Sequence, residues 1–151
     1  MKFTPSKINS FLFFKLPAAY ITGVRVQSIE EKKATVTVKY KWLSQNPFKS
    51  IFWAVQGMAS ELSTGILVMR EIADSGKKIS MLVTNMNATF TKKATGKIQF
   101  ICTDGLLIKD AIQKTIETGE GQTLKMMSEG FNADGISVSK FEYEWSVKVK
   151  S

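Results

Sequence analysis

The sequence predicts a single α+β domain in which a long, mostly apolar helix is wrapped by a twisted antiparallel sheet. As a helix, the segment from Ser50 to about Ala73 would be apolar on most sides, which is typical of a helix buried at the centre of a domain. The segments around it alternate like long strands, and no repeated strand–helix–strand units indicate a parallel sheet. With 151 residues, 44% of them hydrophobic, the chain can form one globular domain, which we expect to span residues 1–151.

The region before the central helix is predicted to form one short helix and two strands. Thr4 and Pro5 favour a helix start, as cap and first helical residue, and Pro17 closes that helix. A first strand is expected from Val24 to Glu30. The segment from 34 to 42 alternates and is predicted to be a half-buried strand, with one face formed by Ala34, Val36, Val38, Tyr40 and Trp42.

The region after the central helix is predicted to contain four strands and one inserted helix. The central helix would be about 36 Å long, close to the length of about 33 Å of a ten-residue strand. Strands are expected at 79–91 and 97–103, followed by a helix that Asp104 caps. A strand at 122–131 and a last long strand are joined as a hairpin by the turn at 132–135. The strand at 79–91 is predicted to have one face formed by Leu82, Thr84, Met86, Ala88 and Phe90.

The histidine and cysteine content excludes several kinds of catalytic and metal site. The chain has no histidine and a single cysteine, Cys102. Serine–histidine–aspartate chemistry, cysteine–histidine chemistry and ordinary zinc sites are therefore excluded, and we expect no metal and no cofactor. Cys102 follows two apolar residues and is expected to be a small buried hydrophobe.

The positive charge is spread along the chain and comes almost entirely from lysine. A net charge of +8 is of the kind that attracts nucleic acid, anionic lipid or a phosphorylated ligand. However, arginine occurs only as Arg25 and Arg70, and no nucleic-acid recognition motif is present. We therefore interpret most lysines as solvated surface and expect no nucleic-acid partner. No apolar run is long enough to span a membrane, and no signal-peptide cleavage site follows residues 11–14, so a cytoplasmic protein is expected.

Three segments resemble the hotdog thioesterase superfamily, in which a long helix is wrapped by an antiparallel sheet. They are Gly23–Val26, Asn46–Ala54, and Met86–Phe90 with the turn Ala94–Gly96 after it. The chain is most similar to a bacterial branch of uncharacterised thioesterase-like proteins, and the resemblance covers most of its length. It implies the hotdog fold, an acyl-CoA or similar acyl thioester as substrate, and a site between the subunits of a homodimer or a dimer of dimers.

The resemblance also implies roles for individual residues. In the phenylacetyl-type branch an asparagine precedes the central helix, a His-Gly pair opens it, and an acidic residue follows on it. Asn46 and Glu61 match the asparagine and the acid, whereas Phe52-Trp53 stands where His-Gly would be. In an alternative alignment the opening pair is Gln56-Gly57, and Gln56 would be an orienting amide. The structural alternative for Asn46 is that it initiates a turn with Pro47.

Glu61 is also singled out by its surroundings on the predicted helix. Gly57, Met58, Thr64 and Gly65 lie three and four residues away and leave unusual space beside it. A carboxylate inside a buried helix is costly and is usually neutralised, paired or used. Glu61 is therefore a candidate general base for water, or a nucleophile toward a thioester carbonyl. The alternative is that it reaches the helix rim and pairs with a lysine.

The remaining candidate residues are expected to bind the substrate. Lysines in the turn after the strand at 79–91 are candidates to hold the phosphates of coenzyme A. Thr84 and Asn85 are candidate polar groups on the facing strand. Aromatic residues and methionines are candidates to line an acyl tunnel, with ordinary core packing as the alternative. The candidate lysines are Lys92 and Lys93, the tunnel candidates are Phe52, Trp53, Met58 and Met86, and Gly57 is a further substrate-binding candidate.

The sequence thus favours an acyl-CoA thioesterase that uses a helix-borne carboxylate, Glu61. The first alternative is a non-catalytic acyl-CoA or lipid-binding hotdog protein, which the missing His-Gly pair favours. The second is a dimeric structural or nucleic-acid-associated protein, which only the net charge favours. A dehydratase is disfavoured because such sites usually use a histidine, which this chain lacks.

Overall fold

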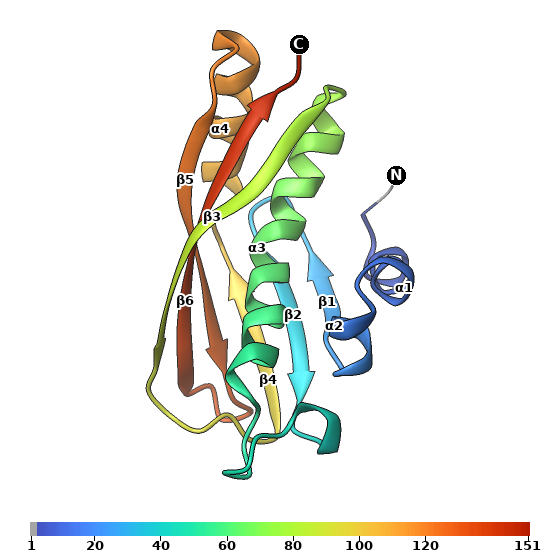
Figure 1. Ribbon diagram of the computed structural model, residues 1–151, viewed down its shortest axis with the longest axis vertical. Coiled ribbons are helices and arrows are strands. Elements are labelled where there is room, and N and C mark those ends of the chain that lie inside the picture. The colour runs from blue at the N-terminus through green and yellow to red at the C-terminus, as the bar shows by residue number, and fades with distance from the viewer. Residues whose placement is uncertain (1–2) are drawn as a thin grey trace.

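A computed structural model describes residues 3–151 of the chain and shows helices packed on one curved sheet (Figure 1). The predicted helices and strands occur in the predicted order, and α2 and the 3-10 helix η1 are additional. None of the helices in residues 3–151 combines the length and hydropathy that a membrane-spanning helix requires. The elements are α1 (Pro5–Lys15), α2 (Pro17–Ile21), β1 (Arg25–Ile29), β2 (Ala34–Lys39), the 3-10 helix η1 (Trp42–Ser44), α3 (Trp53–Ser75), β3 (Ile79–Phe90), β4 (Lys97–Cys102), α4 (Gly105–Thr118), β5 (Gln122–Phe131) and β6 (Ser137–Val149).

The strands form one antiparallel sheet in the order β1-β2-β4-β5-β6-β3. The sheet is strongly twisted and curves around α3, which runs along its length (Figure 1). α3 contacts β1, β2, β4, β5 and β6, while α1 packs beside β1 and α4 packs on β5 and β6. The predicted architecture, a central helix wrapped by an antiparallel sheet, is therefore confirmed.

The core lies between α3 and the inner face of the sheet. Ile66, Leu67 and Val68 in the middle of α3 are buried. Phe100 of β4 and Phe141 of β6 are buried as well, and their rings meet edge to face with centroids 6.0 Å apart. Each such side chain stabilises the fold by roughly 1.5–3 kcal/mol when it leaves water. Burial of the apolar residues of α3 is therefore a large contribution to the stability of the domain.

The N-terminal helix begins and ends as predicted, and a second helix follows it directly. Lys7 donates its backbone N–H to the hydroxyl of Thr4 at 3.3 Å, which confirms Thr4 as the cap. α1 ends at Lys15, but Pro17 is the first residue of a second helix, α2. The prediction that the first helix is closed by Pro17 is therefore confirmed, and what the sequence missed is that proline also suits the first position of a new helix.

The segment between β2 and α3 is irregular over a longer stretch than the sequence predicts. β2 ends at Lys39, and Trp42 lies in η1 with 79% of its surface exposed, so the prediction of Trp42 on a buried strand face is wrong. α3 begins at Trp53 rather than Ser50. The reason is that Ile51 is still extended, since it forms an isolated β-bridge with Gln45.

A bulge in β3 changes which of its residues share a face. The register of β3 against β6 shifts within residues 83–85, with Thr84 as the extra residue. Ahead of the shift, Leu82 is 64% exposed on the outer face, whereas beyond it Met86 lies opposite the buried Tyr143 on the inner face. One inserted residue breaks the period of two on which the prediction depended. It is therefore wrong to assign one face to Leu82, Thr84, Met86, Ala88 and Phe90.

Asp104 occupies the predicted cap position of α4 but makes a different bond. Its side chain makes no hydrogen bond to the first turn of α4. Instead, Oδ2 accepts from the backbone N–H of Met127 on β5 at 2.8 Å. β4 and β5 pair directly only over Gln99–Ile101, so the carboxylate satisfies a strand amide beyond the end of that ladder. The predicted cap bond is wrong because a tertiary donor competes for the same oxygen.

We expect Gly105→Ala to destabilise the fold strongly. A methyl group at Gly105 would collide with the carbonyl oxygen of Glu31 and lie 2.7 Å from the Cα of Lys32, both backbone atoms that cannot rotate away. The free energy of unfolding should fall by about 1–3 kcal/mol or more in chemical denaturation. Gly121→Ala is the matched control, because its nearest neighbours would lie at 3.9 Å. Equal stabilities of the two variants would contradict this packing.

Candidate functional site

A pocket of about 540 Å³ opens at the N-terminal end of α3. Its walls come from the loop ahead of α3, the first turn of α3 and the turn that follows β3. Most of its surface is apolar, and its size is within the range of small-molecule sites. The lining residues are Asn46, Pro47, Phe48, Ser50, Ile51, Phe52, Trp53, Gln56, Phe90, Lys92, Lys93 and Ala94.

The loop at the mouth of this pocket is held by the side chain of Asn46. Its Oδ1 accepts from the backbone N–H groups of Phe48 at 2.9 Å and Ser50 at 3.2 Å. Its Nδ2 donates to the hydroxyl of Ser50 at 2.9 Å and to the carbonyl of Ile51 at 3.5 Å. Asn46 therefore forms the turn that its position ahead of a proline indicates, and both atoms of its amide are engaged within the loop.

Gln56 lies at the base of the pocket and joins α3 to the sheet. Its side chain is buried, its Nε2 donates to the carbonyl of Ile51 at 3.4 Å, and its Oε1 accepts from the hydroxyl of Ser139 on β6 at 2.8 Å. The amide is thus oriented by the structure on both sides. Gln56 fixes the first turns of α3 against β6.

Further along α3, three hydroxyls continue the contact that Gln56 begins. The hydroxyls of Ser60 and Tyr143 are 2.7 Å apart, and Tyr143 also donates to the carbonyl of Gly57 at 3.0 Å. Trp145 donates its indole N–H to Thr64 at 2.9 Å. The third pair is Ser63 with Ser128 of β5, at 2.6 Å. We call these bonds, together with Gln56–Ser139, the helix–sheet polar row.

Sequence reasoning missed the helix–sheet polar row. The available signal was the spacing of Gln56, Ser60, Ser63 and Thr64, which recur at three- and four-residue intervals and so share one face of a helix. Buried polar side chains in such a row need partners. The spacing therefore indicated a second polar row on the sheet, although it did not identify the partners.

Glu61 lies next to this row, and its carboxyl group has no cationic partner. The ion pairs among residues 3–151 do not include it, so the structure does not support the alternative in which Glu61 pairs with a lysine. Burial raises the pKa of Glu61. A methyl group at Gly65 would lie 3.7 Å from its Oε1, whereas one at Gly57 would meet nothing within 4 Å. The helix is therefore open on the side of Gly57.

The predicted site residues fall into three groups in space. The pocket brings together Asn46, Gln56, Phe52-Trp53 and Lys92-Lys93. A second group, which does not line the pocket, follows along α3 and consists of Gly57, Met58 and Glu61. The third group is on β3. There, Thr84 donates to a backbone and a side-chain oxygen of Glu144, at 3.2 and 3.1 Å, and the neighbouring Asn85 is exposed.

Lys93 and Cys102 add little to the chemistry of the site. Lys93 donates from Nζ to the carbonyl of Phe48 at 3.3 Å, which draws one of the candidate lysines across the mouth of the pocket. Burial raises the pKa of Cys102 to about 12, and its side chain is fully buried. The expectation of a small buried hydrophobe is thus confirmed. Within residues 3–151 no group of three or more acidic or cysteine side chains is arranged to hold a metal ion.

The raised pKa of Glu61 predicts a pH-dependent effect of Glu61→Gln on stability. Because the folded state holds the proton more tightly than the unfolded chain, the associated stability is full below the unfolded pKa and is lost as pH rises through the folded pKa. Glutamine is neutral at every pH. We therefore expect Glu61→Gln to match the wild type at about pH 4 and to be more stable than it at about pH 8.

Urea denaturation of both proteins at the two pH values measures this difference. Glu30→Gln, in the exposed turn after β1, is the control for a general effect of removing a carboxylate. A difference between Glu61→Gln and the wild type that is the same at both pH values would contradict the raised pKa.

Comparison with known proteins places the fold in a family. Residues 6–147 match the model of a domain of unknown function, DUF4442. A search of curated proteins finds no match. Among solved structures, a protein of unknown function from Pseudomonas aeruginosa, described as a probable thioesterase, has a TM-score of 0.82 at 17% identity, with 97% of each chain covered.

Two further structures have the same fold. A protein of unknown function from Chlorobaculum tepidum has a TM-score of 0.81 at 15% identity, with 98% of each chain covered. A thioesterase from Haemophilus influenzae has a TM-score of 0.73 at 13% identity, covering 99% of this chain and 93% of its own. These identities establish the fold alone, which is the hotdog fold that the sequence predicts. Because the family model matches residues 6–147, the chain belongs to the DUF4442 family.

Proposed function

We propose that the chain hydrolyses an acyl thioester, with an acyl-CoA as substrate and the carboxylate of Glu61 as the catalytic base. The observation that carries this proposal is the state of Glu61, which has no cationic partner among residues 3–151 and whose pKa is raised by burial. A buried carboxyl group without a charge partner lowers the stability of the folded state, and groups with shifted pKa values occur most often at functional sites. The likeness to structures described as thioesterases supports the same reaction class.

The chemistry follows from a carboxylate with a raised pKa, which is a stronger base near neutral pH. Glu61 takes a proton from a water molecule while the water oxygen forms a bond to the thioester carbonyl carbon. The carbon–sulfur bond then breaks, and the proton passes from Glu61 to the departing thiolate. The products are a carboxylic acid and a thiol. Direct attack by Glu61, followed by hydrolysis of the resulting anhydride, uses the same residue.

The pocket at the start of α3 is suited to the acyl group. Its walls are mostly apolar, and Phe52, Trp53 and Phe90 contribute aromatic surface. Lys92 and Lys93 lie at its edge, where point charges can hold the phosphates of coenzyme A. The backbone N–H groups of the first turn of α3 carry the positive end of the helix dipole and are suited to an anionic oxygen.

In one chain the base and the first turn of α3 are too far apart to act on one carbonyl. Trp53 and Glu61 are separated by eight residues, which corresponds to about 12 Å along the helix. Two chains related by a two-fold axis perpendicular to α3 would run their α3 helices in opposite directions, so that Glu61 of one chain approaches the pocket of the other. We therefore propose a homodimer, which can pair further into a dimer of dimers.

The edge strand β3 supports this dimer. It is 12 residues long, pairs only with β6 among the described strands, and so presents a free row of backbone groups. Long exposed edge strands are usually paired or covered. Its exposed apolar residues include Leu82, Met86 and Phe90, and Phe52 and Trp53 at the start of α3 are exposed as well.

The second candidate function is acyl-CoA or lipid binding without catalysis. The observation that favours it is the aromatic pair Phe52-Trp53, with 44% and 55% of the side chains exposed, at the place where the resembled thioesterases have His-Gly. Both rings line the pocket and reduce the space beside the first turn of α3. A protein of this kind would keep the pocket and lack turnover.

The turnover of acyl-CoAs and its loss in Glu61→Gln test the proposed function. Thiol release from short, medium, long and aromatic acyl-CoAs should show hydrolysis, and Glu61→Gln should lower kcat/KM by about 10²–10⁴-fold. Glu71→Gln is the matched control, because burial raises the pKa of Glu71 too, on the same helix outside the proposed site. Acyl-CoA binding without turnover, unchanged by Glu61→Gln, would support the non-catalytic alternative. Turnover that Glu61→Gln leaves unchanged would contradict the assignment of the base.

A charge on the inner face of β3 should separate the proposed dimer. In Met86→Lys, an exposed side chain becomes one that cannot be buried between subunits without a large cost. We expect a folded monomer in light scattering, and loss of turnover with it. Leu106→Lys, at an exposed apolar position on α4, is the matched control and should remain dimeric. A wild-type chain that is monomeric at about micromolar concentration would contradict the dimer.

A further inference from the structure

The segment between β2 and α3 exposes large apolar side chains that are not on the edge strand β3. Trp42 is 79% exposed, Phe48 is 70% exposed and Leu43 is 48% exposed. Trp42 and Leu43 belong to η1, and Phe48 is at the tip of the following loop. η1 and this loop lie at the end of the molecule where α3 begins (Figure 1). Grouped exposed aromatic residues are uncommon on a soluble surface and indicate an interaction site.

The backbone holds these side chains outward. Ser44 is buried and bonds the backbone of Lys39 and Lys41, which shapes η1. Asn46 accepts the N–H of Phe48 and thereby orders the loop tip. Lys49 follows with a φ of 63°, a left-handed conformation that a non-glycine residue adopts only where its surroundings require it. The apolar residues are thus presented by an ordered loop.

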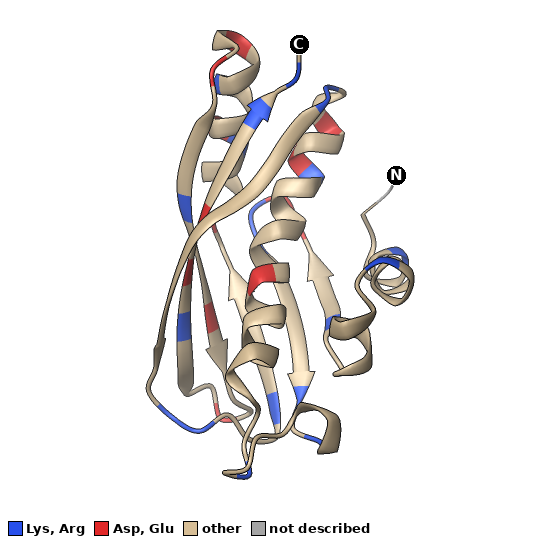
Figure 2. Ribbon diagram, viewed as in Figure 1, with Lys and Arg blue, Asp and Glu red and all other residues tan. Residues whose placement is uncertain are grey.

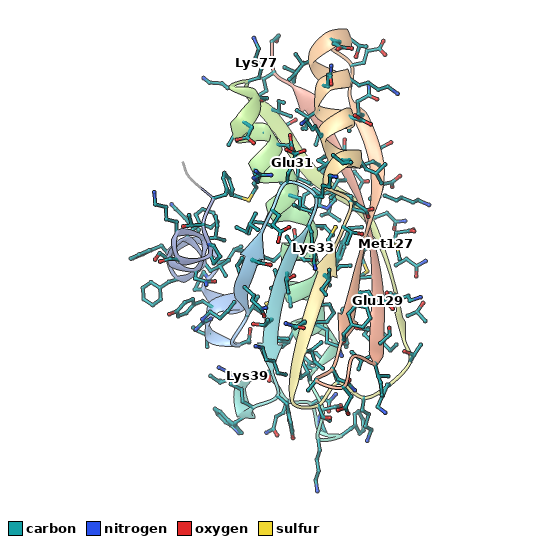
Figure 3. All side chains as sticks on the ribbon, turned by 180° about the vertical axis from the view of Figure 1, so that it is seen from behind. Glu31, Lys33, Lys39, Lys77, Met127 and Glu129 are labelled. Atoms are coloured by element: carbon teal, nitrogen blue, oxygen red, sulfur yellow. The ribbon has the colours of Figure 1, made fainter. Side chains whose placement is uncertain are left out.

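Lysines surround the exposed apolar residues, and acidic residues are scarce there. The sequence contains no acidic residue between Glu31 and Glu61, and none between Asp74 and Asp104. Figure 2 shows basic positions around η1, at the adjoining ends of β2 and β4, and after β3, with one acidic position on the β5–β6 turn. In Figure 3, Lys39 lies at this end, whereas Lys77 lies at the opposite end. The lysines are Lys39, Lys41, Lys49, Lys92, Lys93 and Lys97.

We propose that this end of the molecule binds the surface of a membrane that contains anionic phospholipid. We call it the loop face and define it as Trp42, Leu43 and Phe48 with the six lysines above. Tryptophan and phenylalanine insert at the headgroup level of a bilayer, and surrounding lysines are attracted to anionic headgroups. The loop face presents both the aromatic side chains and the lysines on one ordered surface.

The charge favours lipid over the other occupants of such a face. Two copies of a lysine-rich face would repel each other, so it is not suited to self-association. Single-stranded nucleic acid also combines negative charge with stacking surfaces. However, the loop face contains no arginine, the residue that stacks on bases and forms paired bonds with phosphate.

The proposed membrane contact goes beyond the proposed hydrolase and does not depend on it. Phe48, Lys92 and Lys93 belong both to the loop face and to the lining of the pocket. The mouth of the pocket is therefore beside the bilayer surface when the loop face is bound. A chain without any turnover would still bind vesicles, so the two proposals can fail separately.

Co-sedimentation with vesicles tests the loop face. The full chain is mixed with vesicles of phosphatidylcholine that contain about 30% phosphatidylglycerol, or none, at about 0.1 M salt. We expect binding to the anionic vesicles alone. Trp42→Ala should weaken partitioning by at least about tenfold, and Lys39→Gln with Lys49→Gln by about fivefold for each lysine removed. Thermal melting confirms that the variants are folded.

A charge-matched variant separates the loop face from general attraction of a basic protein. Lys77→Gln with Lys78→Gln removes the same charge at the opposite end, and partitioning should change by less than about twofold. Equal losses in the two double variants, or binding that Trp42→Ala leaves unchanged, would overturn the proposal. So would an absence of vesicle binding, or tighter binding to a single-stranded oligonucleotide than to the anionic vesicles.

Discussion

The alignment of α3 against β6 is the constraint on which the rest of the structure depends. Apolar contacts alone would tolerate small rotations and translations of a helix, because they are non-directional. The helix–sheet polar row does not tolerate them. Ser60 and Thr64 are paired with Tyr143 and Trp145 in the core, and each buried group left unpaired would cost about 1–3 kcal/mol. The row therefore selects one position of the helix.

This position decides what the remaining faces of α3 present. Successive residues of a helix are about 100° apart, so Glu61 points to one side of the direction in which Ser60 faces Tyr143. Its carboxyl group stays near β6, because it adds to the rise that burial causes in the pKa of Tyr143. The carboxyl group then lies on the side where Gly57 and Gly65 remove bulk. The same alignment places Gln56 at the base of the pocket, with its amide held by Ser139. Glu61 and the pocket are thus positioned by one set of hydrogen bonds.

The features that the sequence predicts well are those with a regular period or a local cause. The buried central helix, the alternating strands and the cap at Thr4 are of this kind. Thr84 is different, because the bulge depends on the pairing of β3 with β6, a partner distant in sequence. The misplacement of Trp42 has a similar cause, since alternation continues past the last residue with a strand partner. For Asp104, the carboxylate accepts a hydrogen bond from the N–H of Met127, which is distant in sequence, instead of from the first turn of α4. The space beside Glu61 could be predicted because its neighbours are local in sequence, whereas the partner of Gln56 on β6 is distant in sequence and could not be predicted.

The short ladder between β4 and β5 has a mechanical consequence. Direct pairing there extends over three residue pairs, against six between β2 and β4 and ten between β5 and β6. The sheet thus consists of two parts, β1-β2-β4 and β5-β6-β3, that are joined by a short strand pairing, and α3 contacts both parts. The carboxylate of Asp104 adds one more hydrogen bond between the two parts. A force that separates the two parts of the sheet is therefore opposed more by the packing of α3 on both of them than by strand pairing.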